Sequence, residues 1–97
     1  MEDVQVNRLH LIINGRVQGV GFRYFSYQTG MNLLLHGWVR NRINGNVEIL
    51  AEGQKEKLSL LIREVRKGPQ TAHVDDIEIT WGKAIGDLPP FTILHTK

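Results

Sequence analysis

The chain has 97 residues, with 12 lysines and arginines against 10 aspartates and glutamates and no cysteine. This length predicts a single domain over residues 1–97 with one modest core. The absence of cysteine excludes disulfides, thiol nucleophiles and thiolate metal sites, and a net charge of +2 is too small to indicate nucleic-acid binding. No apolar run is long enough to span a membrane, and residues 1–8 carry no export signal. We therefore expect a cytoplasmic protein that does not bind membranes.

The first predicted elements are a strand and a helix joined by a glycine-rich loop. Leu9, Leu11 and Ile13 occupy every second position, which is typical of a strand over about residues 8–14 with one buried face. A helix is predicted from about residue 22 to 33. Three apolar residues of this helix could face the core: Phe22, Phe25 and Met31.

The remaining predicted elements are a hairpin over about 38–42 and 46–51, a helix between Gly53 and Gly68, a strand over about 74–81 and a short strand near the C-terminus. The dipeptide Asn44-Gly45 favours a tight hairpin with a type I′ turn. Leu58, Leu61 and Val65 repeat at helical spacing. The order βαββαβ predicts an α+β ferredoxin-like two-layer sandwich, in which two helices cover one face of an antiparallel sheet.

The loop before the first helix reads GRVQGVGFR over residues 15–23. Its glycines let the chain curl, and N–H groups at the start of a helix point outward with the positive end of the helix dipole. Arg23 adds a permanent cation whose donors suit two phosphate oxygens. No Walker lysine follows and GxGxxG is absent, so a nucleotide is not implied. The loop by itself indicates either an anion cradle or an ordinary loop whose glycines supply positive φ angles.

A second motif favours the anion cradle over the ordinary loop. Residues 37–53 read GWVRNRINGNVEILAEG, and together with GRVQGVGFR they resemble the two motifs of the acylphosphatase family without a gap. Gly68-Pro69 and the ending from Phe91 to Ile93 extend the resemblance over nearly the whole chain. One departure is Leu34, where the family usually carries a glycine just past the first helix. That glycine would serve as a left-handed helix cap, so the change concerns the local cap geometry and not the chemistry.

The resemblance implies a metal-independent hydrolase that splits the carboxyl-phosphate bond of acyl phosphates into a carboxylate and inorganic phosphate. Arg23 would hold the phosphate and Asn41 would orient the attacking water. Amides of the 16–22 loop would bind the substrate, through Val17, Gln18, Gly19, Val20, Gly21 and Phe22. A carboxylate is a weak base, so its departure needs no protein acid, and a phosphate oxygen would take the proton of the water.

The expected partners are a small-molecule acyl phosphate and inorganic phosphate, as product or inhibitor. The four histidines lack metal-ligand spacing, so we expect no metal and no cofactor. Because the loop grips only the phosphate, the acyl side is left mostly to solvent and broad acceptance of acyl groups is expected. Tyr24 and Tyr27 could border the substrate cleft or simply cover surface, and the sequence leaves both alternatives open.

Two other functions fit parts of the pattern. An RNA-binding module shares the fold but needs aromatic residues on its central strands, where Val47 and Ile49 offer no ring. We therefore expect no nucleic-acid partner. A non-catalytic phosphate- or anion-binding module of ferredoxin-like fold would keep the same loop, and it is the alternative to the hydrolase. The expected state of the chain is a monomer.

Overall fold

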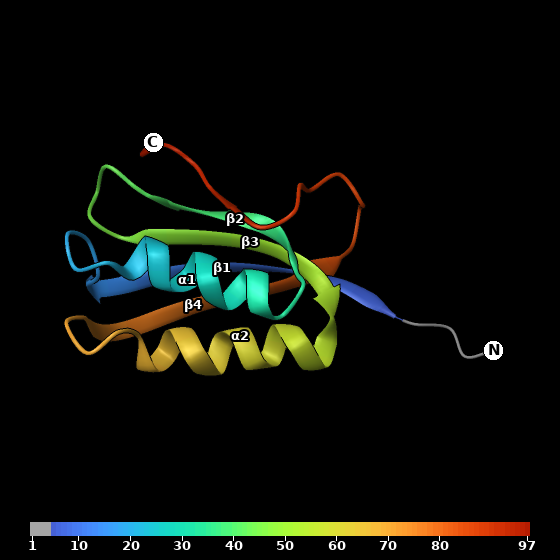
Figure 1. Ribbon diagram of the computed structural model, residues 1–97, viewed down its shortest axis with the longest axis horizontal. Helices are drawn as coiled ribbons and strands as arrows, with labels where there is room; N and C mark the ends of the chain where they lie inside the picture. The colour runs from blue at the N-terminus through green and yellow to red at the C-terminus, as the bar shows by residue number, and fades with distance from the viewer. Residues whose placement is uncertain (1–4) are drawn as a thin grey trace.

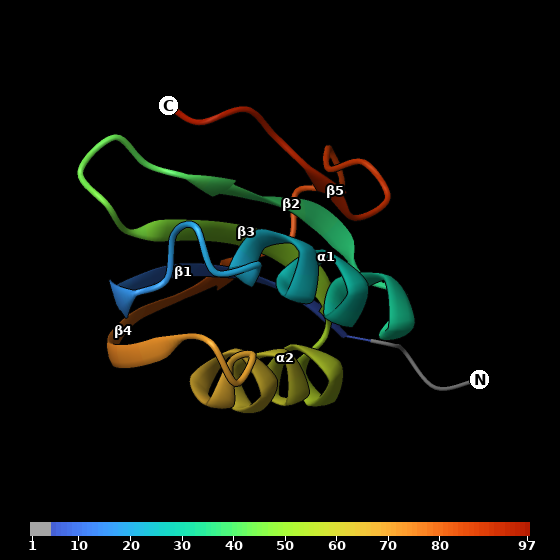
Figure 2. The same cartoon turned by 60° about the vertical axis from the view of Figure 1, so that its left-hand side comes forward.

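The computed structural model describes residues 5–97, which form a sheet covered on one face by two helices (Figures 1 and 2). The elements in chain order are β1 (Val6–Arg16), α1 (Phe22–Asn32), β2 (His36–Asn41), β3 (Val47–Gln54), α2 (Lys55–Lys67), β4 (His73–Lys83) and β5 (Thr92–Ile93). The ferredoxin-like α+β sandwich is confirmed. β1 and β4 are longer than predicted because they pair with each other along nearly their whole lengths, from Asn7 opposite Lys83 to Arg16 opposite His73.

The strand order in the sheet is β4-β1-β3-β2-β5. The first four strands are antiparallel to their neighbours, as predicted. β5 differs, since it pairs in parallel with β2 and places Ile93 opposite Val39. The chain leaves β4 at one edge of the sheet and reaches the opposite edge before it forms β5, which makes the complete sheet mixed.

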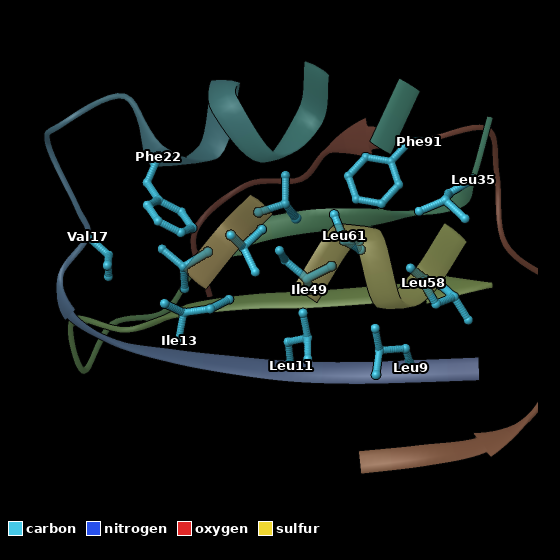
Figure 3. Packing of buried hydrophobic residues seen from close by; sticks show 14 residues of the cluster. Leu9, Leu11, Ile13, Val17, Phe22, Leu35, Ile49, Leu58, Leu61 and Phe91 are labelled. Carbon is cyan, nitrogen blue, oxygen red and sulfur yellow. The ribbon is translucent and has the colours of Figure 1, made fainter. Parts of the chain in front are cut away.

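The core lies between the sheet and the helices (Figure 3). Leu9, Leu11 and Ile13 of β1 are fully buried, as their alternation predicts, because every second residue of a strand points to the same face. They lie opposite buried residues of β3, namely Ala51, Ile49 and Val47. The helices cover this surface with Phe22, Leu58, Leu61 and Val65.

The buried face of α1 is narrower than predicted. Its buried residues are Phe22, Ser26 and Gly30, spaced four residues apart. Phe25 is only half-buried and Met31 is 45% exposed, so of the three apolar residues named above Phe22 alone belongs to the core and the prediction for Met31 is wrong. A Cβ atom on Gly30 would lie 2.5 Å from the ring of Phe91, so this ring takes the space that a larger residue would need. Within residues 5–97, neither helix is long and apolar enough to cross a membrane.

The turn between β2 and β3 is tight, but it is not of the predicted type. A type I′ turn needs a positive φ at both Asn44 and Gly45, and only Gly45, at φ 101°, has one. The Gly45 N–H donates to the Arg42 carbonyl at 3.0 Å, and the Arg42 N–H donates to the Asn46 carbonyl at 2.9 Å. This is the pattern of a type I turn followed by a glycine bulge, so residues 43–45 form a three-residue loop in place of the two-residue loop of a type I′ turn.

Leu34 keeps the backbone conformation that a glycine would adopt at its position. Its φ is 58°, in the left-handed region, and its N–H donates to the Met31 carbonyl at 3.0 Å. The N–H of Leu35 donates to the Gly30 carbonyl at 3.0 Å, so the end of α1 is closed as a helix end with a left-handed cap. The departure from the family pattern therefore leaves the cap geometry intact and adds strain.

Candidate active site

The loop after β1 and the end of β2 lie at the same end of the sheet. Both strands are antiparallel to β3, so β1 and β2 run in the same direction and their C-terminal ends lie at the same end of the sheet. Figures 1 and 2 show the loop, the start of α1 and the β2–β3 turn together at this end. The two motifs that are separate in the sequence therefore meet in space.

A cavity of about 290 Å³ opens where they meet. It is lined by Val17, Gly19, Gly21, Phe22, Arg23, Tyr24, Asn41 and Ile93. The lining contains both predicted catalytic residues, Arg23 and Asn41, and four of the six predicted substrate-binding residues. The folded chain thus brings the arginine of the first motif and the asparagine of the second to one cavity.

The glycines of the loop have the conformation that a cradle requires. Gly19 and Gly21 have φ values of 72° and 81°, and a Cβ atom on either would meet no atom within 4 Å. Gly21 precedes α1, and no side chain within the described residues caps this helix or places a negative charge in its first turn. The first N–H groups of the helix are therefore free to bind an anion, with the helix dipole favouring negative charge.

Arg23 lies in the first turn of α1, half-buried at the cavity. No carboxylate within residues 5–97 lies within ion-pair distance of its guanidinium. Its charge is therefore available to a ligand beside the helix terminus.

Asn41 is the last residue of β2 and is 9% exposed. Gly37, Val39 and Asn41 share the helix-covered face of the strand, since their burial alternates with that of their neighbours. The side-chain oxygen Oδ1 of Asn41 is buried and has no hydrogen-bond partner among the described residues. Buried polar atoms are normally paired, so this carbonyl is suited to accept a hydrogen bond from a bound molecule.

Two predicted loop residues lie outside the cavity lining. The Gln18 side chain turns to the β2–β3 hairpin, where its Nε2 donates to the carbonyls of Arg42 and Asn46 at 2.7 and 2.8 Å. The carbonyl of Val20 accepts a hydrogen bond from the Thr71 hydroxyl at 2.7 Å. Gln18 and Val20 therefore fasten the loop to its neighbours, and any contact of theirs with an anion would come from the backbone.

Tyr24 and Ile93 also line the cavity, and neither was among the predicted site residues. Tyr24 thus lies at this cavity, whereas Tyr27 is not part of its lining and packs partly buried against the core. Ile93 comes from β5, so only the pairing of β5 with β2 brings it there. Its sequence position carries no signal of this, because a contact across about 70 residues depends on the path of the chain.

Arg40 and Arg42 flank Asn41 in the sequence but point to Glu48. Arg40 Nε and Arg42 Nη1 lie 2.8 and 3.3 Å from Glu48 Oε1, and His10 Nε2 lies 2.6 Å from Glu48 Oε2. Burial alone would raise the pKa of Glu48, but the hydrogen bonds from His10 and the arginines outweigh it and hold the pKa below its ordinary value. The two arginines are thus paired with a carboxylate, while Arg23 faces the cavity.

No three histidine, cysteine, aspartate or glutamate side chains come together as a possible metal site within residues 5–97. The groups that line the cavity are backbone amides, a guanidinium, a carboxamide and apolar side chains. This donor set suits an anion such as phosphate.

Comparison with known proteins shows which proteins this chain resembles. The sequence model of the family described as Acylphosphatase matches residues 9–93. An acylphosphatase from Anaeromyxobacter sp. (strain Fw109-5) is 41% identical over 91 residues, which cover 94% of this chain and 98% of that protein. The crystal structure of acylphosphatase from Bacillus subtilis is similar with a TM-score of 0.87 and 40% identity, over 91% of this chain and 98% of that one.

A part of a much larger protein is also similar. The crystal structure of full-length HypF in the phosphate- and nucleotide-bound form matches with a TM-score of 0.88 and 27% identity. The match covers 98% of this chain but 13% of that chain. The same fold therefore occurs within a larger polypeptide.

Proposed function

Because this chain belongs to the acylphosphatase family, we propose that it hydrolyses acyl phosphates to a carboxylate and inorganic phosphate in the cavity that Arg23 and Asn41 share. The observation that carries the proposal is the buried Oδ1 of Asn41, which has no partner among the described residues. It lies in the same cavity as the Arg23 guanidinium and the start of α1, for which residues 5–97 supply neither a carboxylate partner nor a side-chain cap.

The phosphate is held on the loop side of the cavity. N–H groups of the 16–22 loop and of the first turn of α1 donate to its oxygens, and the Arg23 guanidinium supplies the opposing charge. Phosphoryl transfer requires stabilisation of negative charge on the equatorial oxygens, and these donors are in place before the reaction begins.

Asn41 positions the water. Its Oδ1 accepts a hydrogen from the water, and its NH₂ group donates to a phosphate oxygen, which places the two reactants in line. The water oxygen forms a bond to phosphorus as the bond from phosphorus to the carboxyl oxygen breaks. The proton of the water passes to a phosphate oxygen, and the carboxylate leaves unprotonated, so no protein acid or base is needed.

We also propose the oligomeric state, the location and the partners of the enzyme. It acts as a monomer in the cytoplasm on small-molecule acyl phosphates, with inorganic phosphate as product and inhibitor, and needs no cofactor, nucleic acid or membrane. Its net charge of +2 supports weak attraction of a small anion and is too small to support binding of nucleic acid.

The alternative is a phosphate- or anion-binding module without catalysis. The similarity to a part of full-length HypF in its phosphate- and nucleotide-bound form supports this alternative, because there the fold is one portion of a larger protein. A binding module would keep the cradle and Arg23. It would have no need for the unpartnered Asn41 oxygen in the cavity.

The test is hydrolysis of benzoyl phosphate in the presence of a chelator, with inorganic phosphate binding measured in parallel by calorimetry. We expect Asn41→Ala to lower kcat about 100-fold or more while phosphate still binds, because the phosphate keeps the loop amides and Arg23 whereas the water loses its partner. Arg23→Ala should weaken phosphate binding about tenfold and lower turnover as well.

The matched control is Asn44→Ala, which removes an exposed asparagine from the same hairpin outside the cavity. Its kcat should stay within about twofold of the wild type. Folded wild-type protein that binds phosphate but cleaves no benzoyl phosphate would overturn the proposed function in favour of the binding module.

A further inference from the structure

Two apolar side chains stand at the cavity with much of their surface uncovered. Tyr24 is 59% exposed and Ile93 is 38% exposed, and both line the cavity that contains Arg23 and Asn41. A single exposed apolar residue is ordinary, but these two come from α1 and β5, about 70 residues apart, and converge on one cavity. The cavity therefore has an apolar wall beside its phosphate cradle.

Ile93 is fixed beside the site by the C-terminal segment. β5 lies along β2, the Leu94 N–H donates to the Val39 carbonyl at 2.9 Å, and the Lys97 N–H donates to the Asn41 carbonyl at 3.1 Å. The segment thus follows β2 to the residue that is proposed to position the water. On the other side of Ile93, the Gly37 N–H donates to the Pro89 carbonyl at 2.8 Å, so backbone hydrogen bonds hold Ile93 in place from both sides.

Tyr24 is braced from its own helix. Its hydroxyl accepts a hydrogen bond from Gln28 Nε2 at 3.0 Å, one turn further along α1, and its ring lies 6.2 Å from the ring of Tyr27. The polar end of the side chain is therefore satisfied on the helix surface. The aromatic ring is left to line the cavity next to Arg23.

We propose that Tyr24 and Ile93 form a binding wall for the acyl group, so that the enzyme prefers acyl phosphates with longer apolar acyl chains to acetyl phosphate. This inference rests on the proposed function and refines the expectation of broad acceptance. An acyl phosphate has two parts, and once the cradle and Arg23 hold the phosphate, the remaining apolar lining is available only to the acyl part. A cavity of about 290 Å³ suits a small ligand of this kind.

The expected ratio of kcat/KM values depends on how much of the acyl chain the wall of Tyr24 and Ile93 shields from solvent. Full burial of a methylene contributes about 0.8 kcal/mol, which corresponds to a factor of about four. Because the wall is exposed to solvent, each methylene is covered somewhat less than half, and we expect a factor of about 1.8. Over the four methylenes that separate acetyl from hexanoyl phosphate, kcat/KM should rise about tenfold.

The experiment compares kcat/KM for acetyl, butanoyl and hexanoyl phosphate. Their leaving carboxylates have similar basicity, so the intrinsic reactivity of the bond is matched. We expect the hexanoyl-to-acetyl ratio to be about ten in the wild type and about three or less in Tyr24→Ala and in Ile93→Ala. Tyr24→Phe keeps the ring and should keep the ratio.

Two control variants remove exposed apolar side chains away from the cavity. Met31 is 45% exposed on α1 and Ile43 is 86% exposed in the hairpin turn, so Met31→Ala and Ile43→Ala should retain the ratio of about ten. Inhibition by inorganic phosphate reports whether the cradle is intact, and its inhibition constant should stay within about twofold in every variant.

A wild-type ratio near one, or an unchanged ratio in Tyr24→Ala and Ile93→Ala, would show that the wall does not bind the acyl group. That result leaves hydrolysis itself in place. Failure of the proposed function looks different, because none of the three substrates would then be cleaved, and both proposals would be overturned.

Discussion

Asn41 and Leu34 each occupy a position that costs stability. The buried Oδ1 of Asn41 lacks a partner among the described residues, which costs about 1–3 kcal/mol where no water replaces it. Leu34 adopts a left-handed backbone, which costs a non-glycine residue about 1–2 kcal/mol. The cost at Asn41 is explained by its place in the cavity. Leu34 is 77% exposed, and nothing in the structure explains a leucine there.

We therefore expect Leu34→Gly to raise the free energy of unfolding. Glycine removes the left-handed strain but loses more conformational entropy on folding, so the net gain should be about 0.5–1 kcal/mol, measured by urea unfolding. For a chain of this size the midpoint of thermal unfolding should rise by a few degrees. Leu34→Ala is the control, because it removes the same exposed side chain and keeps the strain. A loss of stability in Leu34→Gly would contradict the prediction.

At the scale of elements, the site depends on one cross-link. The Gln18 amide joins the loop after β1 to the β2–β3 hairpin through the carbonyls of Arg42 and Asn46. These two carbonyls lie directly beyond the strand end that carries Asn41. The cross-link therefore fixes the loop, which holds the phosphate, relative to the asparagine that is proposed to hold the water.

Gln18→Ala should loosen this arrangement. Two hydrogen bonds contribute about 1–3 kcal/mol together, and we expect that loss of stability and a fall in kcat of about tenfold, because the phosphate and the water are no longer held in register. Phosphate binding should change little. The control is Gln70→Ala, which removes an exposed glutamine from the connection before β4. Equal losses of kcat and phosphate binding in Gln18→Ala would indicate instead that Gln18 binds the anion.

For the whole molecule, two buried carboxylates organise the sheet face opposite the helices. Glu48 binds His10 and two arginines, and Glu52 accepts hydrogen bonds from Arg8 and from the Ile85 and Gly86 N–H groups, which fastens the connection after β4. Burial alone would raise the pKa of Glu52, but the backbone N–H groups and Arg8 outweigh it. The pKa values of both carboxylates therefore lie below the ordinary value of 4.5.

The lowered pKa values of Glu48 and Glu52 determine how the stability of the fold depends on pH in acid. A carboxylate whose pKa is lowered by folding stabilises the fold above its unfolded pKa, and the contribution is lost as the pH falls through the folded pKa. The free energy of unfolding should thus fall below about pH 4.5, and Glu48→Gln or Glu52→Gln should make that fall shallower. Urea unfolding between about pH 6 and pH 3 measures it. Glu78→Gln, at an exposed position of β4, is the control and should leave the pH dependence of the free energy of unfolding unchanged. An unchanged pH dependence in both Glu48→Gln and Glu52→Gln would contradict the assignment.

Much of this fold could be predicted because it is encoded locally. Alternation in Leu9, Leu11 and Ile13 and the helical repeat of Leu58, Leu61 and Val65 each determine a buried face, whatever lies against it. The predictions that were wrong concern positions whose structure depends on contacts with other elements. Met31 is apolar and yet exposed, because α1 turns Phe22, Ser26 and Gly30 to the core, where the Phe91 ring packs against Gly30. Asn44-Gly45 suits a two-residue turn, but the register of β2 and β3 requires one more loop residue.

The candidate site divides in the same way. The order of the elements, the two motifs and the positive φ angles of Gly19 and Gly21 could be predicted from the sequence, because they depend on residues close together in the chain. The folded chain was needed to find that Gln18 faces the hairpin, that Tyr24 and Ile93 line the cavity, and that Arg40 and Arg42 turn to Glu48. Each of these contacts joins different elements, and the physical reason is that the direction and partner of a side chain depend on which strands pair and where the chain crosses the sheet.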